Sequence, residues 1–369
     1  MLNLSYYMPV KLFYGADCIK QNACYFQSLG RKCLIVTGKN SAKVSGALDD
    51  VLQVLEKHQI DFIIFDEIKQ NPLLSDCVRA GKIAQSEQVD FVIGIGGGSP
   101  LDAAKAVSVF ASNEMEPLKI FEGNYVNRPL PLILVGTTAG TGSEVTPYSV
   151  LNVDIGEDKV ARKRSVQNLY AAASFGDYQY TRSLNQSITI ATALDTLSHC
   201  IESYFSKKSN TISEGFAKQG AKLVVDVFRD LNGEFTDKQR QKLYAASIYG
   251  GLAIAKTGTC YCHSMGYFLT EDYQVAHGIA CAVFLPSFLR LGCELDTKKA
   301  DELLFELDDN LSNLCDMIEN LTQYRPIYLT QTQKNELCER WKKDNKFASS
   351  PGDFTVADAM ELIDEIFGV

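Results

Sequence analysis

The chain has 369 residues, of which 46% are hydrophobic and 22% are charged, and its formal net charge is −9. This length and composition predict a soluble globular protein with two domains. The sequence contains no basic run that could follow a phosphate backbone and no apolar stretch long enough to cross a bilayer, which argues against nucleic acid and membranes as partners.

Short β-rich runs alternate with amphipathic stretches in the first half of the chain. In chain order, the patterns predict a strand at 33–38, a helix at 41–58, a strand at 61–66, a helix at 73–86, a strand at 90–98, a helix from Pro100 and a fourth strand from Pro131. Such alternation is typical of a parallel sheet that is covered by helices on both faces and joined by right-handed crossovers.

The second half of the chain has a different pattern, with long helical periodicity and no convincing strand after about residue 180. Helices are expected at 188–206, 213–231, 236–256, 301–321 and 355–367, the last opened by a capping box of Thr355 and Asp358. We therefore predict an α/β domain over residues 1–184 and an all-helical domain over residues 185–369, with the boundary in the polar stretch 180–187.

Two glycine-rich loops each follow a predicted strand. In GIGGGSPLDAAK (94–105), Ser99 is expected to cap a helix, with Pro100 at its first position and Asp102 completing a capping box. The resulting helix N-terminus is suited to an anion, although a plain strand–turn–helix connection explains this loop equally well. The second loop, GTTAGTGSEVTP (136–147), favours the anion site, because two loops at the carboxyl ends of parallel strands converge on one crevice. A nucleotide site is therefore predicted.

The four histidines contain a candidate metal site. His58 lies in a charged helical stretch and is interpreted as a surface residue. Asp195 and His199 are four residues apart in a predicted helix, so their side chains share a face, as an Asp–His hydrogen bond or a pair of metal ligands would require. His263 and His277 are ordinary core or surface residues when taken singly. As a set, one carboxylate and three imidazoles suit Fe²⁺, Zn²⁺, Co²⁺ or Ni²⁺ better than Ca²⁺ or Mg²⁺.

The eleven cysteines are odd in number and scattered, and the N-terminus lacks the basic-then-apolar pattern of a signal peptide. Free thiols in the cytoplasm are expected. A thiolate metal site at Cys260 and Cys262 is disfavoured, because no second cysteine pair follows at zinc-finger spacing, and two small buried residues are predicted instead.

Several stretches together resemble the iron-containing alcohol dehydrogenases (group III), whose superfamily includes glycerol dehydrogenase and dehydroquinate synthase. They are GGGSPLDAAK, GTTAGTGSEVTPYSVL, ALDTLSHCIE, CHSMGY and AHGIACAVFLP, and they span nearly the whole chain. The resemblance implies an N-terminal nucleotide domain, a C-terminal metal domain and an active site in the cleft between them. It also implies that Asp195, His199, His263 and His277 hold the metal, with Fe²⁺ favoured and Zn²⁺ compatible.

Cofactor contacts are likewise implied by the resemblance. They fall on Gly97, Gly98, Ser99 and Asp102 in the first loop, on Thr137, Thr138, Thr141 and Ser143 in the second, and on Asn71 and Lys163 elsewhere. NAD-preferring relatives carry an Asp after the first strand of the nucleotide domain, where this chain has Gly38 followed by Lys39. Because a carboxylate there would repel a 2′-phosphate, its absence predicts a preference for NADP, with NAD as the alternative.

One position departs from the pattern of many relatives, which carry a histidine proposed for proton relay where this chain has Tyr267.

The predicted function is hydride transfer between NADP(H) and a small primary alcohol or aldehyde such as butanol, 1,3-propanediol or lactaldehyde, by a homodimer. The alternatives are a glycerol dehydrogenase-like enzyme, a lyase of the dehydroquinate synthase type, and a nucleotide- or metal-binding protein without turnover. The lyase is disfavoured because the sequence shows neither a Glu ligand nor a basic cluster for a phosphorylated substrate.

Overall fold

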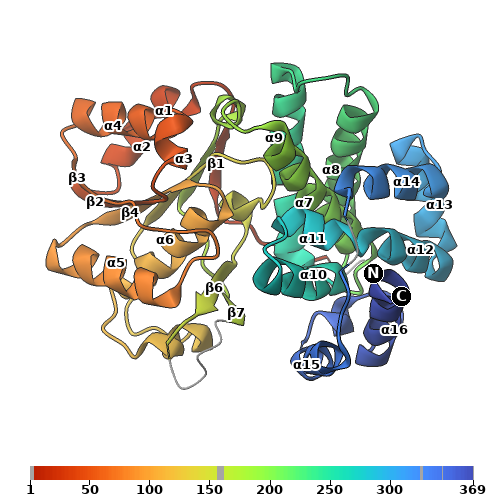
Figure 1. Ribbon diagram of the computed structural model, residues 1–369. Helices are drawn as coiled ribbons and strands as arrows, with labels where there is room; N and C mark the ends of the chain where they lie inside the picture. The colour runs from red at the N-terminus through yellow and green to blue at the C-terminus, as the bar shows by residue number, and fades with distance from the viewer. Residues whose placement is uncertain (1–3, 156–161, 325–326, 343, 369) are drawn as a thin grey trace. The chain divides into compact units, whose positions relative to one another are not determined.

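The computed structural model describes residues 4–155, 162–324, 327–342 and 344–368. The chain divides into two compact units, each described by itself below (Figure 1). Residues 7–185 and 235–244 form the α/β unit, and residues 186–234 and 245–369, with the N-terminal residues up to Tyr6, form the helical unit. In the described ranges, no helix combines the length and apolar character needed to cross a membrane.

A six-stranded, fully parallel sheet is the centre of the α/β unit, as predicted. Its spatial order is β1 (Lys11–Tyr14), β8 (Ala173–Gly176), β5 (Leu132–Gly136), β4 (Phe91–Gly96), β2 (Lys32–Thr37) and β3 (Asp61–Phe65). A separate antiparallel pair consists of β6 (Ser149–Val153) and β7 (Arg162–Val166).

Helices cover both faces of this sheet (Figure 1). They are α1 (Cys18–Gln21), α2 (Cys24–Gln27), α3 (Ser41–Val44), α4 (Ala47–Lys57), α5 (Leu74–Ser86) and α6 (Gly98–Phe110). Successive residues of β2 enter opposite cores: Leu34 and Val36 pack with residues of α5 and α6, whereas Cys33 and Ile35 pack with residues of α1, α2 and α4. This double burial explains why the central strands are continuous apolar runs rather than alternating ones.

The helical unit is built from long helices with short 3₁₀ turns, and the described residues after Gly176 contain no strand. Its helices are α7 (Gln186–Phe205), α8 (Thr211–Arg229), α9 (Asp237–Thr257, whose first residues group with the α/β unit), α10 (Tyr261–Asp272), α11 (His277–Ala282), α12 (Leu285–Leu295), α13 (Thr297–Leu307), α14 (Leu311–Thr322), α15 (Gln331–Trp341) and α16 (Val356–Phe367). The predicted capping box is present, with Thr355 and Asp358 bonding each other's backbone N–H at the start of α16.

Some predicted details were wrong. The segment 41–58 is two helices, separated at Ser45 and Gly46. The segment 301–321 is also divided, because Asp308 adopts a left-handed φ of 52°. Strands β1, β6, β7 and β8 were not predicted, because their short sequences KLFY, SVLNV, RKRSV and ASFG contain no continuous apolar run like those of the central strands.

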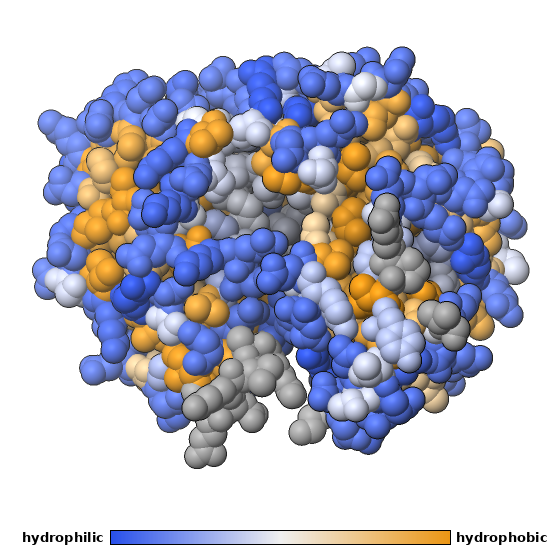
Figure 2. Space-filling view, in the orientation of Figure 1, coloured by the Kyte–Doolittle hydropathy of each residue, from blue (hydrophilic) through white to orange (hydrophobic). Residues whose placement is uncertain are grey.

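Side chains on the face shown in Figure 2 are mainly hydrophilic, with hydrophobic residues in smaller patches. The eleven cysteines, all of which lie in the described ranges, are free thiols.

Candidate functional site

The two glycine-rich loops of the α/β unit lie side by side at the carboxyl ends of β4 and β5, which are hydrogen-bonded neighbours. A Cβ atom on Gly98 would lie 2.7 Å from Cγ2 of Thr141, and one on Gly97 would lie 3.0 Å from Cγ2 of Thr138. Contacts this close leave no space for a side chain, so glycine is required for the loops to approach each other. The predicted convergence of the loops is confirmed.

The predicted cap of α6 was wrong, because the helix begins two residues earlier, at Gly98, with Gly97 as its N-cap residue. Ser99 therefore lies inside the first turn, where its Oγ accepts a hydrogen bond from the backbone N–H of Asn71 (3.2 Å). Asp102 does not complete a capping box either. Its Oδ1 accepts from Oγ of Ser143 (2.7 Å) and its Oδ2 accepts from the backbone N–H of Val150 (2.9 Å).

A buried lysine that the sequence analysis missed completes this network. Lys105 is fully buried in α6 and its Nζ donates to Oγ of Ser143 (2.8 Å) and to the carbonyl oxygen of Tyr148 (2.7 Å), 3.8 Å from Asp102. Burial lowers the pKa of Lys105 to about 8, against the opposing effect of Asp102. Its signal in the sequence was a single charge in the apolar stretch AAKAV. The network ties the second loop to α6 and gives Asp102 and Ser143 a structural task.

Three of the predicted nucleotide contacts follow directly on parallel strands: Gly38 after β2, Gly97 after β4 and Thr137 after β5. A fourth, Asn71, lies in the segment that follows β3. They therefore lie along one edge of the sheet, where ligands of doubly wound folds bind. Thr138 and Thr141 are half-buried in the second loop. Lys163 lies in β7, opposite Asn152 of β6.

The predicted metal ligands come together in the helical unit, around one oxygen of Asp195. The Nε2 atoms of the three histidines lie at 3.5 Å (His263), 3.8 Å (His199) and 3.9 Å (His277) from Oδ1 of Asp195. A cation about 2.1 Å from each of two donors spans donor separations of roughly 3–4 Å. The observed separations fit that range. Burial alone would raise the pKa of Asp195, but the three neighbouring histidines hold it well below its usual range, so the carboxylate remains charged.

Helix geometry and one glycine bring these side chains together. Asp195 and His199 are one turn apart on α7, and the ring of His199 stacks on that of His263 at 4.6 Å between centroids. His277 begins α11, which lies against α7 at Gly278, where a Cβ atom would lie only 1.8 Å from the carbonyl oxygen of Ala191. Only glycine permits this approach, which carries His277 to Asp195.

Glu202, another residue that the sequence analysis missed, determines which nitrogen of His263 faces Asp195. Glu202 is fully buried in α7, and its Oε2 bonds to Nδ1 of His263. Because a carboxylate can only accept, Nδ1 carries the proton, and Nε2 presents a lone pair towards Asp195. Among the described residues, neither Nε2 of His263 nor Oδ1 of Asp195 has a hydrogen-bond partner. Two buried lone pairs facing each other repel unless a proton or a metal cation lies between them, and the surrounding carboxylate and imidazole donors fit a divalent metal.

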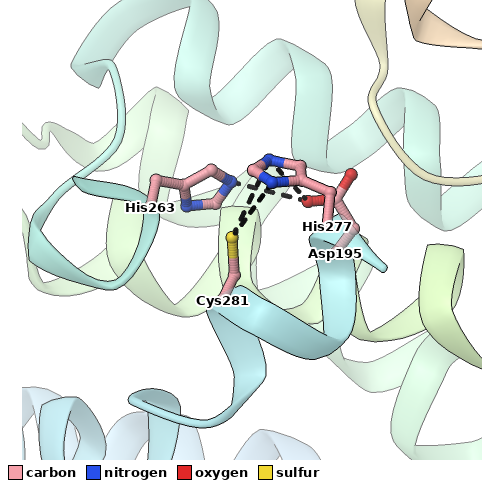
Figure 3. Close-up of side chains that lie close together, drawn as sticks. All are labelled: Asp195, His263, His277 and Cys281. Atoms are coloured by element: carbon pink, nitrogen blue, oxygen red, sulfur yellow. Dashed lines mark hydrogen bonds and ion pairs between the residues drawn. The ribbon is translucent and has the colours of Figure 1, made fainter. Parts of the chain in front are cut away.

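Cys281, which was not predicted, belongs to the group of ligand atoms that lie closest together, and the predicted ligand His199 is not a member of that group. Cys281 is one turn after His277 on α11, and ligand atoms of Asp195, His263, His277 and Cys281 lie within 4.8 Å of one another (Figure 3). The spacing of His277 and Cys281 was the available signal in the sequence. Cys260 and Cys262 are buried outside this group, as predicted.

Tyr267, the predicted relay residue, stacks on the ring of His277 with centroids 5.7 Å apart and an interplanar angle of 15°. Its hydroxyl accepts a hydrogen bond from Nζ of Lys346 (2.8 Å). Lys346 follows α15 in a stretch without periodicity, and nothing in the sequence distinguished it.

Replacing Glu202 with glutamine is expected to weaken metal binding about 10- to 100-fold. Glu202 accepts from Nδ1 of His263 through Oε2 and from the backbone N–H of Cys260 through Oε1 (3.0 Å). An amide has only one oxygen, so its NH₂ must face one of these donors. If it faces His263, the imidazole proton moves to Nε2 and blocks the ligand atom. Competition with a chromophoric chelator measures the affinity.

The matched control is Glu214→Gln, because Glu214 pairs with Lys299 (2.7 Å) elsewhere in the helical unit. Metal affinity is expected to be unchanged in this variant. Equal affinities for the wild type and Glu202→Gln would contradict the role assigned to Glu202.

Comparison with known proteins agrees with both halves of the site. Residues 9–177 match the family described as iron-containing alcohol dehydrogenase, and residues 189–337 match the C-terminal domain of the same family. The 1,3-propanediol dehydrogenase of Klebsiella pneumoniae is 30% identical over 313 residues, which cover 84% of this chain and 80% of that protein. The sulfoacetaldehyde reductase of Bilophila wadsworthia is 32% identical over 292 residues, or 77% of this chain and 74% of that protein.

The fold agrees as well. The crystal structure of an iron-containing alcohol dehydrogenase from Thermotoga maritima superposes with a TM-score of 0.90 at 31% identity, covering 99% of both chains. Family matches over both parts of the sequence, relatives at 30% identity or more, and a cluster of lone-pair donors suited to a cation all lead to one assignment. The chain belongs to the iron-containing alcohol dehydrogenase family.

Proposed function

We propose that this protein is a metal-dependent alcohol dehydrogenase that acts as an aldehyde reductase, transferring hydride between NADP(H) and a small primary alcohol or aldehyde. The observation that carries this proposal is the pair of buried, unpartnered lone-pair atoms on Asp195 and His263, with two further imidazoles beside them. The relatives named above are described as acting on 1,3-propanediol and on sulfoacetaldehyde, which supports small alcohols and aldehydes as the substrate class.

The metal, the cofactor and the protein side chains have different roles in the proposed reaction. When bound, the cation supplies Lewis-acid polarisation of the substrate oxygen, and the nicotinamide supplies the hydride. Asp195, His199, His263 and His277 are the proposed ligands, with Fe²⁺ favoured and Zn²⁺ compatible. Backbone N–H groups at Gly97 and Gly98, at the start of α6, would bind the dinucleotide.

In the direction of reduction, the aldehyde carbon receives a hydride and its oxygen receives a proton. Tyr267 is the proposed donor of that proton, because its ring lies against His277. Its hydroxyl accepts from Lys346, which leaves its own proton directed elsewhere.

A reconstitution assay tests the proposal. Protein purified without oxygen is loaded with Fe²⁺ or Zn²⁺, its metal content is measured by mass spectrometry, and NADPH oxidation is followed with butyraldehyde and a panel of short aldehydes. We expect turnover that depends on the metal. Fully loaded protein that reduces none of these aldehydes would contradict the proposal.

A preference for NADPH over NADH in kcat/KM is expected, because Gly38 supplies no carboxylate beside the ribose and Lys39 next to it is exposed. The nearby Lys43 pairs with Asp66 (3.2 Å), so Lys39 is the basic residue proposed to face the 2′-phosphate. Lys39→Glu should lower kcat/KM for NADPH about tenfold and leave that for NADH nearly unchanged, because it places a negative charge near the 2′-phosphate.

A substitution at Lys39 tests this preference better than one at Gly38. A Cβ atom at Gly38 would lie 3.1 Å from the carbonyl oxygen of Ile68, so a side chain there would also disturb the backbone packing. Lys57→Glu, an exposed change on α4, is the control for net charge. A higher kcat/KM with NADH than with NADPH in the wild type would contradict the preference for NADPH.

We also propose a homodimer in the cytoplasm. The free thiols of all eleven cysteines support a reducing compartment.

A further inference from the structure

Lys346 places a cation beside the candidate metal centre. Its Nζ lies 2.8 Å from the hydroxyl oxygen of Tyr267 and 4.0 Å from the centroid of that ring. The Tyr267 ring in turn stacks on His277. Burial opposes protonation of Lys346, but Tyr267 and Asp344 outweigh it and raise the pKa of the side chain, which is therefore charged at neutral pH.

This ammonium group has no counterion in the described part of the chain, where no Asp or Glu oxygen lies within 4.0 Å of it. The nearby acidic residues are engaged elsewhere. Asp344 accepts from the backbone N–H of Lys346 (2.8 Å) and from Oγ of Ser264, and Glu202 bonds to His263. An ammonium group has three N–H donors, and the hydrogen bond to Tyr267 uses one of them, so this cation can also donate to a bound anion.

Differences in burial show from which side a ligand reaches the cluster. Asp195, His199 and His263 are buried, with 3–5% of each residue exposed. The His277 side chain is 29% exposed, and Tyr267 and Lys346 are also partly exposed. A small molecule that approaches from solvent therefore meets His277, Tyr267 and Lys346 first.

We propose that Lys346 binds an anionic group at the far end of the substrate, so that the preferred substrates are short aldehydes carrying a carboxylate or sulfonate. The inference rests on the proposed reductase function and narrows its substrate class. The Nζ atom and the His277 ring are separated by at most the two contact distances of the intervening tyrosine ring, which a short aliphatic chain can span. An ammonium–carboxylate hydrogen bond would then fix the aldehyde end at the metal ligands.

The competing interpretation is that Lys346 only orients the Tyr267 hydroxyl. The two roles differ in their consequences. A positioning role lowers kcat for every aldehyde by the same factor, whereas an anion-binding role adds a rise in KM for the charged aldehydes alone.

The test compares 4-oxobutanoate with its neutral methyl ester, and adds sulfoacetaldehyde to separate sulfonate from carboxylate recognition. Wild-type enzyme, loaded with metal, is expected to favour the anionic aldehydes over the ester in kcat/KM. Lys346→Met should lower kcat/KM for the anions about 10- to 100-fold more than for the ester, mainly through KM, whereas the lost orientation of Tyr267 lowers kcat for all aldehydes by the same factor. Lys346→Arg should retain most of the preference. Calorimetry with the product alcohol 4-hydroxybutanoate measures binding without turnover.

The outcomes separate the inference from the function on which it rests. If all aldehydes are reduced without charge preference, or if Lys346→Met slows all of them in parallel, the anion site is overturned and the reductase stands. If no aldehyde is reduced but 4-hydroxybutanoate binds to the wild type and not to Lys346→Met, the reductase proposal fails and the anion site is supported.

Discussion

Replacing His263 with alanine is expected to abolish bound metal and to lower kcat/KM for aldehyde reduction by about a thousandfold or more, the effect of losing several kcal/mol of transition-state stabilisation. His263 is central to the cluster, because its Nε2 is 3.5 Å from Asp195, its ring stacks on His199, and its Nδ1 is bonded to Glu202. Removing the imidazole leaves two buried carboxylates, Asp195 and Glu202, without a ligand between them.

Metal stoichiometry by mass spectrometry and steady-state kinetics on the same preparation measure this result. His58→Ala is the matched control, since His58 lies at the end of α4 in the α/β unit and should change neither quantity. His263→Ala protein that retains one metal ion and near-normal turnover would disprove the proposed ligand set. Circular dichroism of both variants distinguishes loss of metal from loss of fold.

Replacing Lys105 with methionine is expected to destabilise the α/β unit by about 3–5 kcal/mol, because one partner of a buried charged network is removed. Asp102 and Glu144 would then remain buried without this cation, and Ser143 and the carbonyl oxygen of Tyr148 would lose a donor. The second glycine-rich loop should loosen, so that cofactor affinity falls together with stability.

Hydrogen exchange measured on peptides from residues 132–153 reports local stability in this unit, and urea unfolding reports the midpoint for the chain. Methionine keeps the length of the lysine side chain, so the change is mainly in charge. Lys57→Met, an exposed substitution on α4, is expected to be within about 0.5 kcal/mol of wild type. Unchanged exchange in Lys105→Met would show that the buried lysine is not what holds the loop.

Burial on two faces and helical periodicity made much of the fold predictable. Strands β2, β4 and β5 are apolar on both sides because helices cover both faces of the sheet, and this leaves a pattern that can be read without coordinates. Strands β1 and β8 are four residues each and are held by their neighbours in the sheet, so their residues carry too little pattern of their own.

Some residues of the candidate site were also predictable from the sequence, whereas others were not. The sequence by itself determined the family, the donor types Asp195, His199, His263 and His277, and the two glycine loops, because helix spacing and glycine runs act between near neighbours in the chain. Only the tertiary structure decided the roles of Lys105, Glu202, Cys281 and Lys346. Glu202 and His263 are 61 residues apart and Tyr267 and Lys346 are 79 apart. Contacts at such separations depend on how whole helices pack. A hydrogen bond or an unpaired charge has a large energetic effect only where it is buried, and burial is a property of the fold.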